Sequence, residues 1–198
     1  LQRGDRRPVV AASAGNHSAG MAWAARRLGL QATAVVPRNA PASKVASTRR
    51  LGAEVIVHGD GYEEAQQEAM RLAHANHWRF LSAFDDPDVI AGQGTIAMEI
   101  LGANPDVVLV PVGGGGLASG MGIMLKEMGI SLVGVCVDGV DAMKRTLNGD
   151  LRPFQPPLTL ADGTRVARPG NLTSAICAQV LDEIISVPES MVRQTMGE

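Results

Sequence analysis

The stretch "DVVLVPVGGGGLASG", residues 106–120, decides the fold of the second half of this chain. A continuous apolar run predicts a buried strand over 106–112, and four glycines separate it from a run that predicts a helix over 120–129. The backbone N–H groups of the four glycines can all point at one anion, and the positive end of the helix dipole adds to the attraction. Because glycine has no side chain to block the anion, we predict a phosphate-binding turn here.

The same alternation of apolar runs and helical periodicity extends along the whole chain. In the first half, predicted strands cover 8–13, 32–37, 53–59 and 79–84, and predicted helices cover 17–29, 42–52 and 62–77. In the second half, predicted strands at 106–112, 131–138 and 183–188 alternate with helices from about Gly94, at 120–129 and from Leu172. Repeated βα units predict an α/β fold of two parallel twisted sheets with helices on both faces.

The sequence "DDPD" at residues 85–88 interrupts this alternation. We therefore predict a domain boundary near 85–92, with a small α/β domain at 8–85 and part of a larger α/β domain at 86–198. Within the first domain, we expect Ser43 to cap the helix at 42–52 and Gly52 to end it.

Composition excludes several classes of function. Charged residues make up 19% of the chain and the net charge is −2, so no basic field attracts nucleic acid. No apolar run reaches the roughly 18 residues of a membrane span. Cys136 and Cys177 lie in apolar surroundings without metal-ligand spacing, which predicts buried thiols and a cytoplasmic protein. The N-terminus shows neither a signal peptide nor a start methionine, so we expect the chain to be cut at its front.

A second unusual turn, "SAGNHSAG" at residues 13–20, also joins a predicted strand to a predicted helix. The backbone N–H groups between Ala14 and His17 can bind a second anion such as a carboxylate, and Asn16 offers an amide to a hydroxyl or phenolate oxygen. The alternative is that Asn16 and His17 form an ordinary turn and helix cap.

The glycine-rich turn also permits a dinucleotide-binding reading. Gly113, Gly115 and Ala118 fit the pattern G-x-G-x-x-A, and Asp138 ends the next predicted strand at the spacing of the ribose-binding acid. Taken alone, the turn leaves both ligands open.

The two turns together resemble the fold-type-II pyridoxal-phosphate enzymes, most closely the branch of threonine/serine dehydratases and serine racemases. The resemblance runs the length of the chain. It is carried by "SAGNHSAG", "PVGGGGLASG", "ATAVVPRNAPASKV", "LGAEVIVHGDGYEEA", "FDDPDVIAGQGT" and "ADGTRVARPGNLT", in this order and spacing. The dinucleotide alternative becomes remote.

This resemblance implies a role for each turn. The cofactor phosphate is expected on the glycine-rich turn, at Gly113, Gly114, Gly115, Gly116 and Leu117. The substrate carboxylate is expected on the backbone of Ser13, Ala14, Gly15, Asn16 and His17. Asn16 is further expected to hydrogen-bond the pyridine 3'-oxygen, and Gly163 to lie against the ring. The reaction implied is elimination of the β-hydroxyl and then of ammonia, which converts L-threonine to 2-oxobutanoate, and serine remains open as a substrate.

Three departures from the family pattern qualify these expectations. The family's Schiff-base lysine lies in a segment before the asparagine turn, and none of Lys44, Lys126 and Lys144 matches it. A downstream serine or threonine that meets the pyridine nitrogen is expected beyond Glu198. The racemases carry a serine where this chain has Ala14, which favours dehydratase activity.

No metal site is expected. The acidic metal ligands of the racemases align with Cys136 and Ala142, although Asp138 or Asp141 could substitute. His74 and His77, three residues apart on a predicted helix, have no third ligand near in sequence and are expected on the surface.

We therefore interpret the chain as an internal fragment of a pyridoxal-phosphate-dependent threonine/serine ammonia-lyase with an incomplete large domain. The chain alone is expected to be inactive. Its expected partners are a small amino-acid substrate and further copies of itself in a homo-oligomer, and no nucleic-acid or membrane partner is expected. The alternative is a catalytically inactive truncated homologue that serves as a binding or oligomerisation module.

Overall fold

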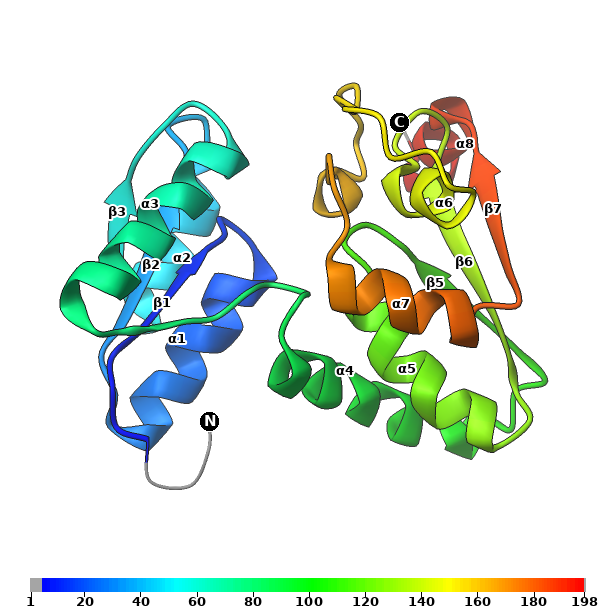
Figure 1. Cartoon of the computed structure of the whole chain (residues 1–198), viewed down its shortest axis with the longest axis horizontal. Helices are drawn as coiled ribbons and strands as arrows, with labels where there is room; N and C mark the ends of the chain where they lie inside the picture. Colours follow the sequence, from blue (N-terminus) through cyan, green and yellow to red (C-terminus); the bar gives the residue numbers. More distant parts are fainter. Residues whose placement is uncertain (1–4, 198) are drawn as a thin grey trace. The chain divides into compact units, whose positions relative to one another are not determined.

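A computed structural model describes residues 5–197 and divides the chain into two compact units, Leu1–Ala83 and Phe84–Glu198 (Figure 1). Each unit contains one parallel sheet, of four strands in the first and three in the second. The α/β fold with two parallel sheets is therefore confirmed. The division falls between Ala83 and Phe84, close to the expected boundary.

The N-terminal unit has the strand order β3-β2-β1-β4. The strands are β1 (Val9–Ala12), β2 (Ala32–Val36), β3 (Glu54–Val57) and β4 (Arg79–Phe80), and the helices are α1 (Asn16–Leu28), α2 (Ala42–Arg50) and α3 (Tyr62–Asn76). Side chains of β1 alternate between the two faces. Val9 and Ala11 pack with Met21 of α1, whereas Val10 packs with Ala69 of α3. Helices therefore cover both faces of this sheet.

The C-terminal unit has the strand order β5-β6-β7. Its strands are β5 (Val107–Pro111), β6 (Ser131–Val137) and β7 (Glu183–Val187). Its helices are α4 (Pro87–Ile100), α5 (Gly116–Glu127), α6 (Ala142–Leu147), α7 (Asn171–Val180) and α8 (Glu189–Met196), with short 3-10 turns η1 (Leu101–Ala103) and η2 (Asp162–Thr164). Helix α5 lies between α4 and α7 (Figure 1), and its Leu125 is completely buried against β6.

Close packing of α4 on α5 depends on glycine. A Cβ on Gly120 would lie 2.3 Å from the Ile90 carbonyl oxygen and 2.6 Å from the Gly94 nitrogen. The two backbones can approach only because neither crossing position carries a side chain. This packing explains why Gly94 of α4 and Gly120 of α5 are tolerated inside helices, where each glycine costs about 1 kcal/mol relative to alanine.

Four predictions of local structure were wrong. Helix α2 begins at Ala42 with Pro41 as its N-cap, so Ser43 lies inside the helix and does not cap it. Helix α4 begins at Pro87, well before Gly94, because Asp86 caps it by accepting the Asp88 and Val89 N–H groups. Helix α5 begins at Gly116, four residues before its predicted start. The predicted strand at 79–84 shrinks to the two residues of β4.

The two cysteines are free and buried, as predicted. Between residues 5 and 197, no helix combines the length and apolar character needed to cross a membrane.

Candidate functional site

The glycine loop, residues 113–116, is the turn between β5 and α5 of the C-terminal unit. The sheet holds its first end, because Val112 donates its N–H to the Val135 carbonyl at 2.8 Å. Gly115 is the N-cap of α5, and its carbonyl accepts the Ser119 N–H at 2.8 Å. Within residues 5–197, the four N–H groups of the loop have no acceptor. Gly114, Gly115 and Gly116 are nonetheless buried, so these donors are available for an anion at the start of a helix.

The structure gives the glycines a second reason besides the one predicted. A Cβ on Gly114 would lie 2.3 Å from the Phe84 ring, and one on Gly116 would lie 2.9 Å from Phe84 Cα. Gly115 has φ +91°, and a Cβ there would lie 2.4 Å from Met143 Cε. A side chain would therefore collide with the protein itself before it met an anion. The loop is a packed part of the core whose donors are fixed in place.

Helix α7 holds the carbonyl side of the same loop. Thr173 donates its hydroxyl to the Gly114 carbonyl at 2.6 Å, and the Cys177 thiol donates to the Gly115 carbonyl at 3.8 Å. Ser119 of α5 donates its hydroxyl to the Thr173 carbonyl at 3.3 Å. Burial raises the pKa of the Cys177 thiol, so the group stays protonated at neutral pH and can act as this donor.

The segment "ADGT" also reaches the loop. A Cβ on Gly113 would lie 2.9 Å from Cα of Thr164, which ends the turn η2. Gly163 is the neighbouring residue, is exposed, and has open space around its Cβ position. The expected contact of Gly163 with a cofactor ring stays a prediction.

The asparagine loop, residues 13–17, lies in the N-terminal unit between β1 and α1. The Ser13 hydroxyl accepts the Gly15 N–H at 3.1 Å, and Ser18 donates its hydroxyl to the Gly15 carbonyl at 2.9 Å. Helix α1 begins at Asn16, which is exposed. A short turn closed at both ends therefore presents Asn16 at the positive end of a helix.

His17 has a structural partner. Its Nε2 lies 3.2 Å from the Leu81 carbonyl oxygen, which links the first turn of α1 to the segment after β4. Behind it, the buried Ser18 and Thr48 hydroxyls lie 3.3 Å apart and connect α1 to α2. These contacts hold the loop against the segment after β4 and against α2.

The three lysines occupy defined positions. Lys126 lies near the C-terminal end of α5 and donates to the Gln179 carbonyl. Ten residues of helix at 1.5 Å each place its Cα about 15 Å along the axis from Gly116. Lys144 of α6 donates to the Ser186 hydroxyl at 3.1 Å, and Lys44 belongs to α2 of the other unit.

A metal ion in a protein needs several ligand side chains close together, at the positions that align with the racemases' metal ligands or elsewhere. The region from residue 5 to 197 contains no group of three or more His, Cys, Asp or Glu side chains that could hold an ion. Cys136 Sγ lies 3.4 Å from Ser186 Oγ, and the same Ser186 hydroxyl accepts a hydrogen bond from the Lys144 ammonium group. His74 and His77 are both exposed.

A polar depression of about 450 Å³ on the N-terminal unit lies apart from the asparagine loop. Its charged groups already pair with one another, as Arg38 does with Asp60 at 3.0 Å and Arg71 with Glu68 at 2.6 Å. Since a carboxylate pairs with each of the two guanidinium groups, this depression offers an anion no unpaired guanidinium group. The glycine loop, with unsatisfied donors, is the stronger candidate.

A family model described as pyridoxal-phosphate-dependent enzyme matches residues 1–198. The chain belongs to this family. L-threonine ammonia-lyase of Thermotoga maritima is 44% identical over 192 residues, covering 94% of this chain and 48% of that protein. The catabolic L-threonine dehydratase TdcB of Escherichia coli K12 is 40% identical over 196 residues, covering 96% of this chain and 60% of that protein.

A solved structure extends the comparison to the fold. The processed form of threonine deaminase isoform 2 from Solanum lycopersicum superposes with a TM-score of 0.87 at 36% identity, covering 95% of this chain and 53% of that one. This member of the pyridoxal-phosphate family therefore lies in the threonine dehydratase and serine racemase branch of fold type II. It spans about half the length of the relatives it matches.

The glycine loop fits the phosphate of that cofactor. Buried N–H donors without an acceptor in the described chain lie at the N-terminus of a twelve-residue helix, in a turn too crowded for any side chain. Sequence reasoning found this loop and missed the residues that shape it. Phe84, Thr164 and Thr173 lie in stretches that carry the family resemblance, but nothing in the sequence indicated that they, or Cys177, contact the glycine loop.

Proposed function

We propose that this chain forms part of a threonine/serine ammonia-lyase that uses pyridoxal phosphate. The observation that carries the proposal is the glycine loop, whose four N–H groups have no acceptor within residues 5–197 and whose Gly114, Gly115 and Gly116 are buried. Similarity to threonine dehydratases at about 40% identity over nearly the whole chain supports the choice of reaction.

The chain's own residues then have the following tasks. The N–H groups of the glycine loop and of Leu117 hold the cofactor phosphate. In the asparagine loop the Ser13 N–H donates to the Val35 carbonyl and the Gly15 N–H to the Ser13 hydroxyl, so the remaining backbone N–H groups hold the substrate carboxylate. The Asn16 amide donates to the pyridine 3'-oxygen. When bound, pyridoxal phosphate supplies an electron sink for the carbanion formed as the substrate Cα loses its proton. Loss of the β-hydroxyl as water and hydrolytic release of ammonia convert L-threonine to 2-oxobutanoate.

Ala14 supports elimination over racemisation. Racemisation needs a second acid–base group on the opposite face of Cα, and the resemblance expects a serine hydroxyl at this position. A methyl group can neither accept nor donate a proton. We therefore propose a dehydratase, with both threonine and serine as substrates.

We further propose that the 198-residue chain has no dehydratase turnover by itself. Proton removal from Cα by a positioned base is worth about 10²–10⁴-fold in rate. Lys126 is directed to the Gln179 carbonyl and Lys144 to Ser186, so neither amine is held at the glycine loop. This observation also supports the second candidate, a module that binds the cofactor or a partner without catalysis.

Two assays test these proposals. Equilibrium dialysis with pyridoxine 5'-phosphate, which has no aldehyde to react with lysine, should show binding that inorganic phosphate competes away. Release of 2-oxobutanoate from L-threonine should not exceed that of free pyridoxal phosphate. No saturable binding would contradict the phosphate site, and turnover with a borohydride-trapped adduct on one of the three lysines would contradict the proposed inactivity.

The cellular compartment of the protein is a further proposal. Two buried free thiols fit a reducing compartment, and we propose the cytoplasm.

A further inference from the structure

Helix α7 contacts the glycine loop from the side of its carbonyl groups. Thr173 and Cys177 are four residues apart, so both project from one face of the helix. Thr173 Oγ1 lies 2.6 Å from the Gly114 carbonyl oxygen, and Cys177 Sγ lies 3.8 Å from that of Gly115. Both side chains are fully buried. Two successive carbonyls of the loop are therefore bonded to the same helix.

These bonds determine where the N–H groups of the loop point. The peptide bonds of the loop are trans, and in a trans peptide the C=O and the following N–H point in opposite directions. When Thr173 draws the Gly114 carbonyl toward α7, the Gly115 N–H must point away from α7. Glycine alone would leave these peptide planes free to rotate.

Helix α7 is itself fixed at its N-terminus by Asp85. The Asp85 carboxylate accepts the N–H groups of Asn171, Leu172 and Thr173 at 3.1, 2.9 and 3.1 Å. The carboxylate fits because Gly170 has no side chain, since a Cβ there would lie 2.2 Å from Asp85 Oδ1. An anionic acceptor at this position also stabilises the helix dipole.

The residue before Asp85 contacts the loop directly. Phe84 lies against Gly114 and Gly116, so two adjacent residues hold both the loop and the helix that orients it. The loop is thus enclosed by Phe84 on one side and α7 on another, and its peptide planes are set by contacts from distant parts of the sequence.

We propose that Thr173 is a positioning residue for phosphate binding: its hydroxyl fixes the Gly114 peptide so that the Gly115 N–H points at the bound phosphate. Asp85 supports it by fixing the first turn of α7. This inference rests on the proposed phosphate site, and it adds a residue that touches neither the phosphate nor the substrate.

The test compares three variants of the 198-residue chain by their dissociation constants for inorganic phosphate and pyridoxine 5'-phosphate. Thr173→Val keeps the shape and removes the hydroxyl, and we expect binding about 5- to 10-fold weaker, the effect of one hydrogen bond. Thr173→Ser restores the hydroxyl and should bind within about twofold of the original. Ser174→Ala is the matched control, because that hydroxyl bonds the Gly170 carbonyl and not the loop.

The outcomes separate the two proposals. If the unaltered chain binds neither probe, the phosphate site and this inference both fail. If it binds both and Thr173→Val binds equally well, only the inference fails. Should Thr173→Val not fold, the amide resonances of the unaltered chain decide, because phosphate must shift the Gly115 amide proton downfield. A Gly115 amide that does not respond would overturn the proposal.

Discussion

At the scale of single residues, the glycine loop shows how a correct motif can have an incomplete explanation. The sequence indicated that glycine leaves room for an anion, and the structure shows that glycine also leaves room for Phe84 and Met143. A bound phosphate and close core packing both require the same four residues. The first requirement is visible in a strand–glycine–helix pattern, whereas the second depends on side chains brought in by folding.

Gly115 allows these requirements to be separated. We expect Gly115→Ala to lower the free energy of unfolding by about 1–3 kcal/mol, since φ +91° is unfavourable for alanine and its Cβ would meet Met143. Gly129→Ala is the control, because Gly129 has φ +71° and open space around its Cβ position. Urea unfolding of both variants measures the difference. Equal losses would mean that packing against Met143 contributes nothing.

Other residues of the site could not be predicted at all. Asp85 accepts the N–H of Thr173, which lies more than eighty residues away in sequence. The Thr173 hydroxyl in turn donates from α7 to the Gly114 carbonyl of the glycine loop. Both residues lie in stretches that carry the family resemblance, but their contacts with each other and with the glycine loop form only when the chain folds. Asn16 and His17 were found because their turn is unusual in itself.

At the scale of elements, local signals were reliable where a residue acts on its neighbours. Helix α1 ends as predicted, with Gly29 in the left-handed region at φ 66°. The start of α4 was missed because "DDPD" was interpreted as a break, although an aspartate N-cap followed by proline is a favourable helix start. Strand β4 is short because pairing with β1 extends over only two residues, which depends on tertiary structure.

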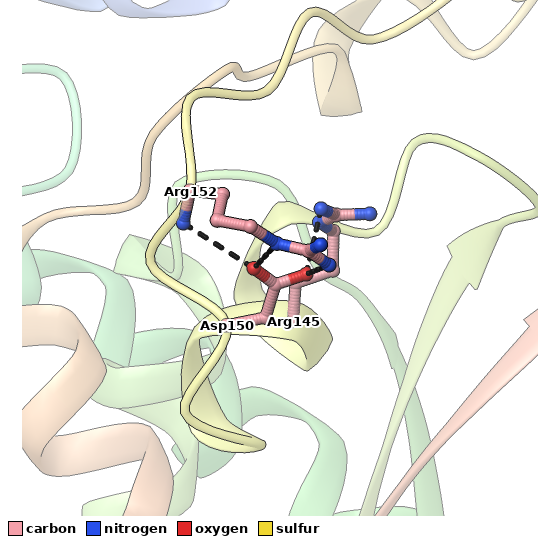
Figure 2. A network of polar contacts seen from close by, with 3 residues as sticks. All are labelled: Arg145, Asp150 and Arg152. Carbon is pink, nitrogen blue, oxygen red and sulfur yellow. Dashed lines mark hydrogen bonds and ion pairs between the residues drawn. The ribbon is translucent and has the colours of Figure 1, made fainter.

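Three charged side chains at and just after the end of α6 form a network whose contribution to stability should depend on pH (Figure 2). Asp150 binds Arg152 through two charge-assisted hydrogen bonds of 2.8 Å each and pairs with Arg145 at 2.7 Å. The hydrogen bonds from Arg152, followed by the charge of Arg145, hold the pKa of the Asp150 carboxyl well below its ordinary value. Since the folded pKa is the lower one, this pairing stabilises the fold above about pH 4 and is lost as the pH falls toward the folded pKa.

We expect the Asp150 carboxyl carbon to titrate well below pH 4 in NMR spectra, and Arg152→Gln to move the midpoint upward. Arg168→Gln removes an arginine that does not contribute to this shift and should leave the midpoint unchanged. A midpoint near the ordinary aspartate value in the unaltered chain would show that the network does not persist in solution.

At the scale of the whole molecule, the C-terminal sheet exposes apolar surface at its edge. Strand β5 ends the strand order, and its Val107 and Leu109 are 54% and 65% exposed. Edge strands with exposed apolar side chains favour association. We therefore predict concentration-dependent self-association in sedimentation velocity.

Leu109→Lys should shift this equilibrium toward monomer, since a charge would have to be buried in the contact. Leu158→Lys is the control, because Leu158 is 85% exposed and lies outside the sheets. A chain that stays monomeric at every concentration would contradict the prediction, and an equal effect of both variants would remove β5 from the contact.

A crystal structure of this chain, from crystals grown with pyridoxal phosphate, tests most directly the central claim that the glycine loop binds the cofactor phosphate. The account predicts the phosphate at the start of α5, with its oxygens about 2.7–3.2 Å from backbone nitrogens of the glycine loop and the Gly114 carbonyl still bonded to Thr173. Phosphate bound at any other place, with the glycine loop empty, would contradict it.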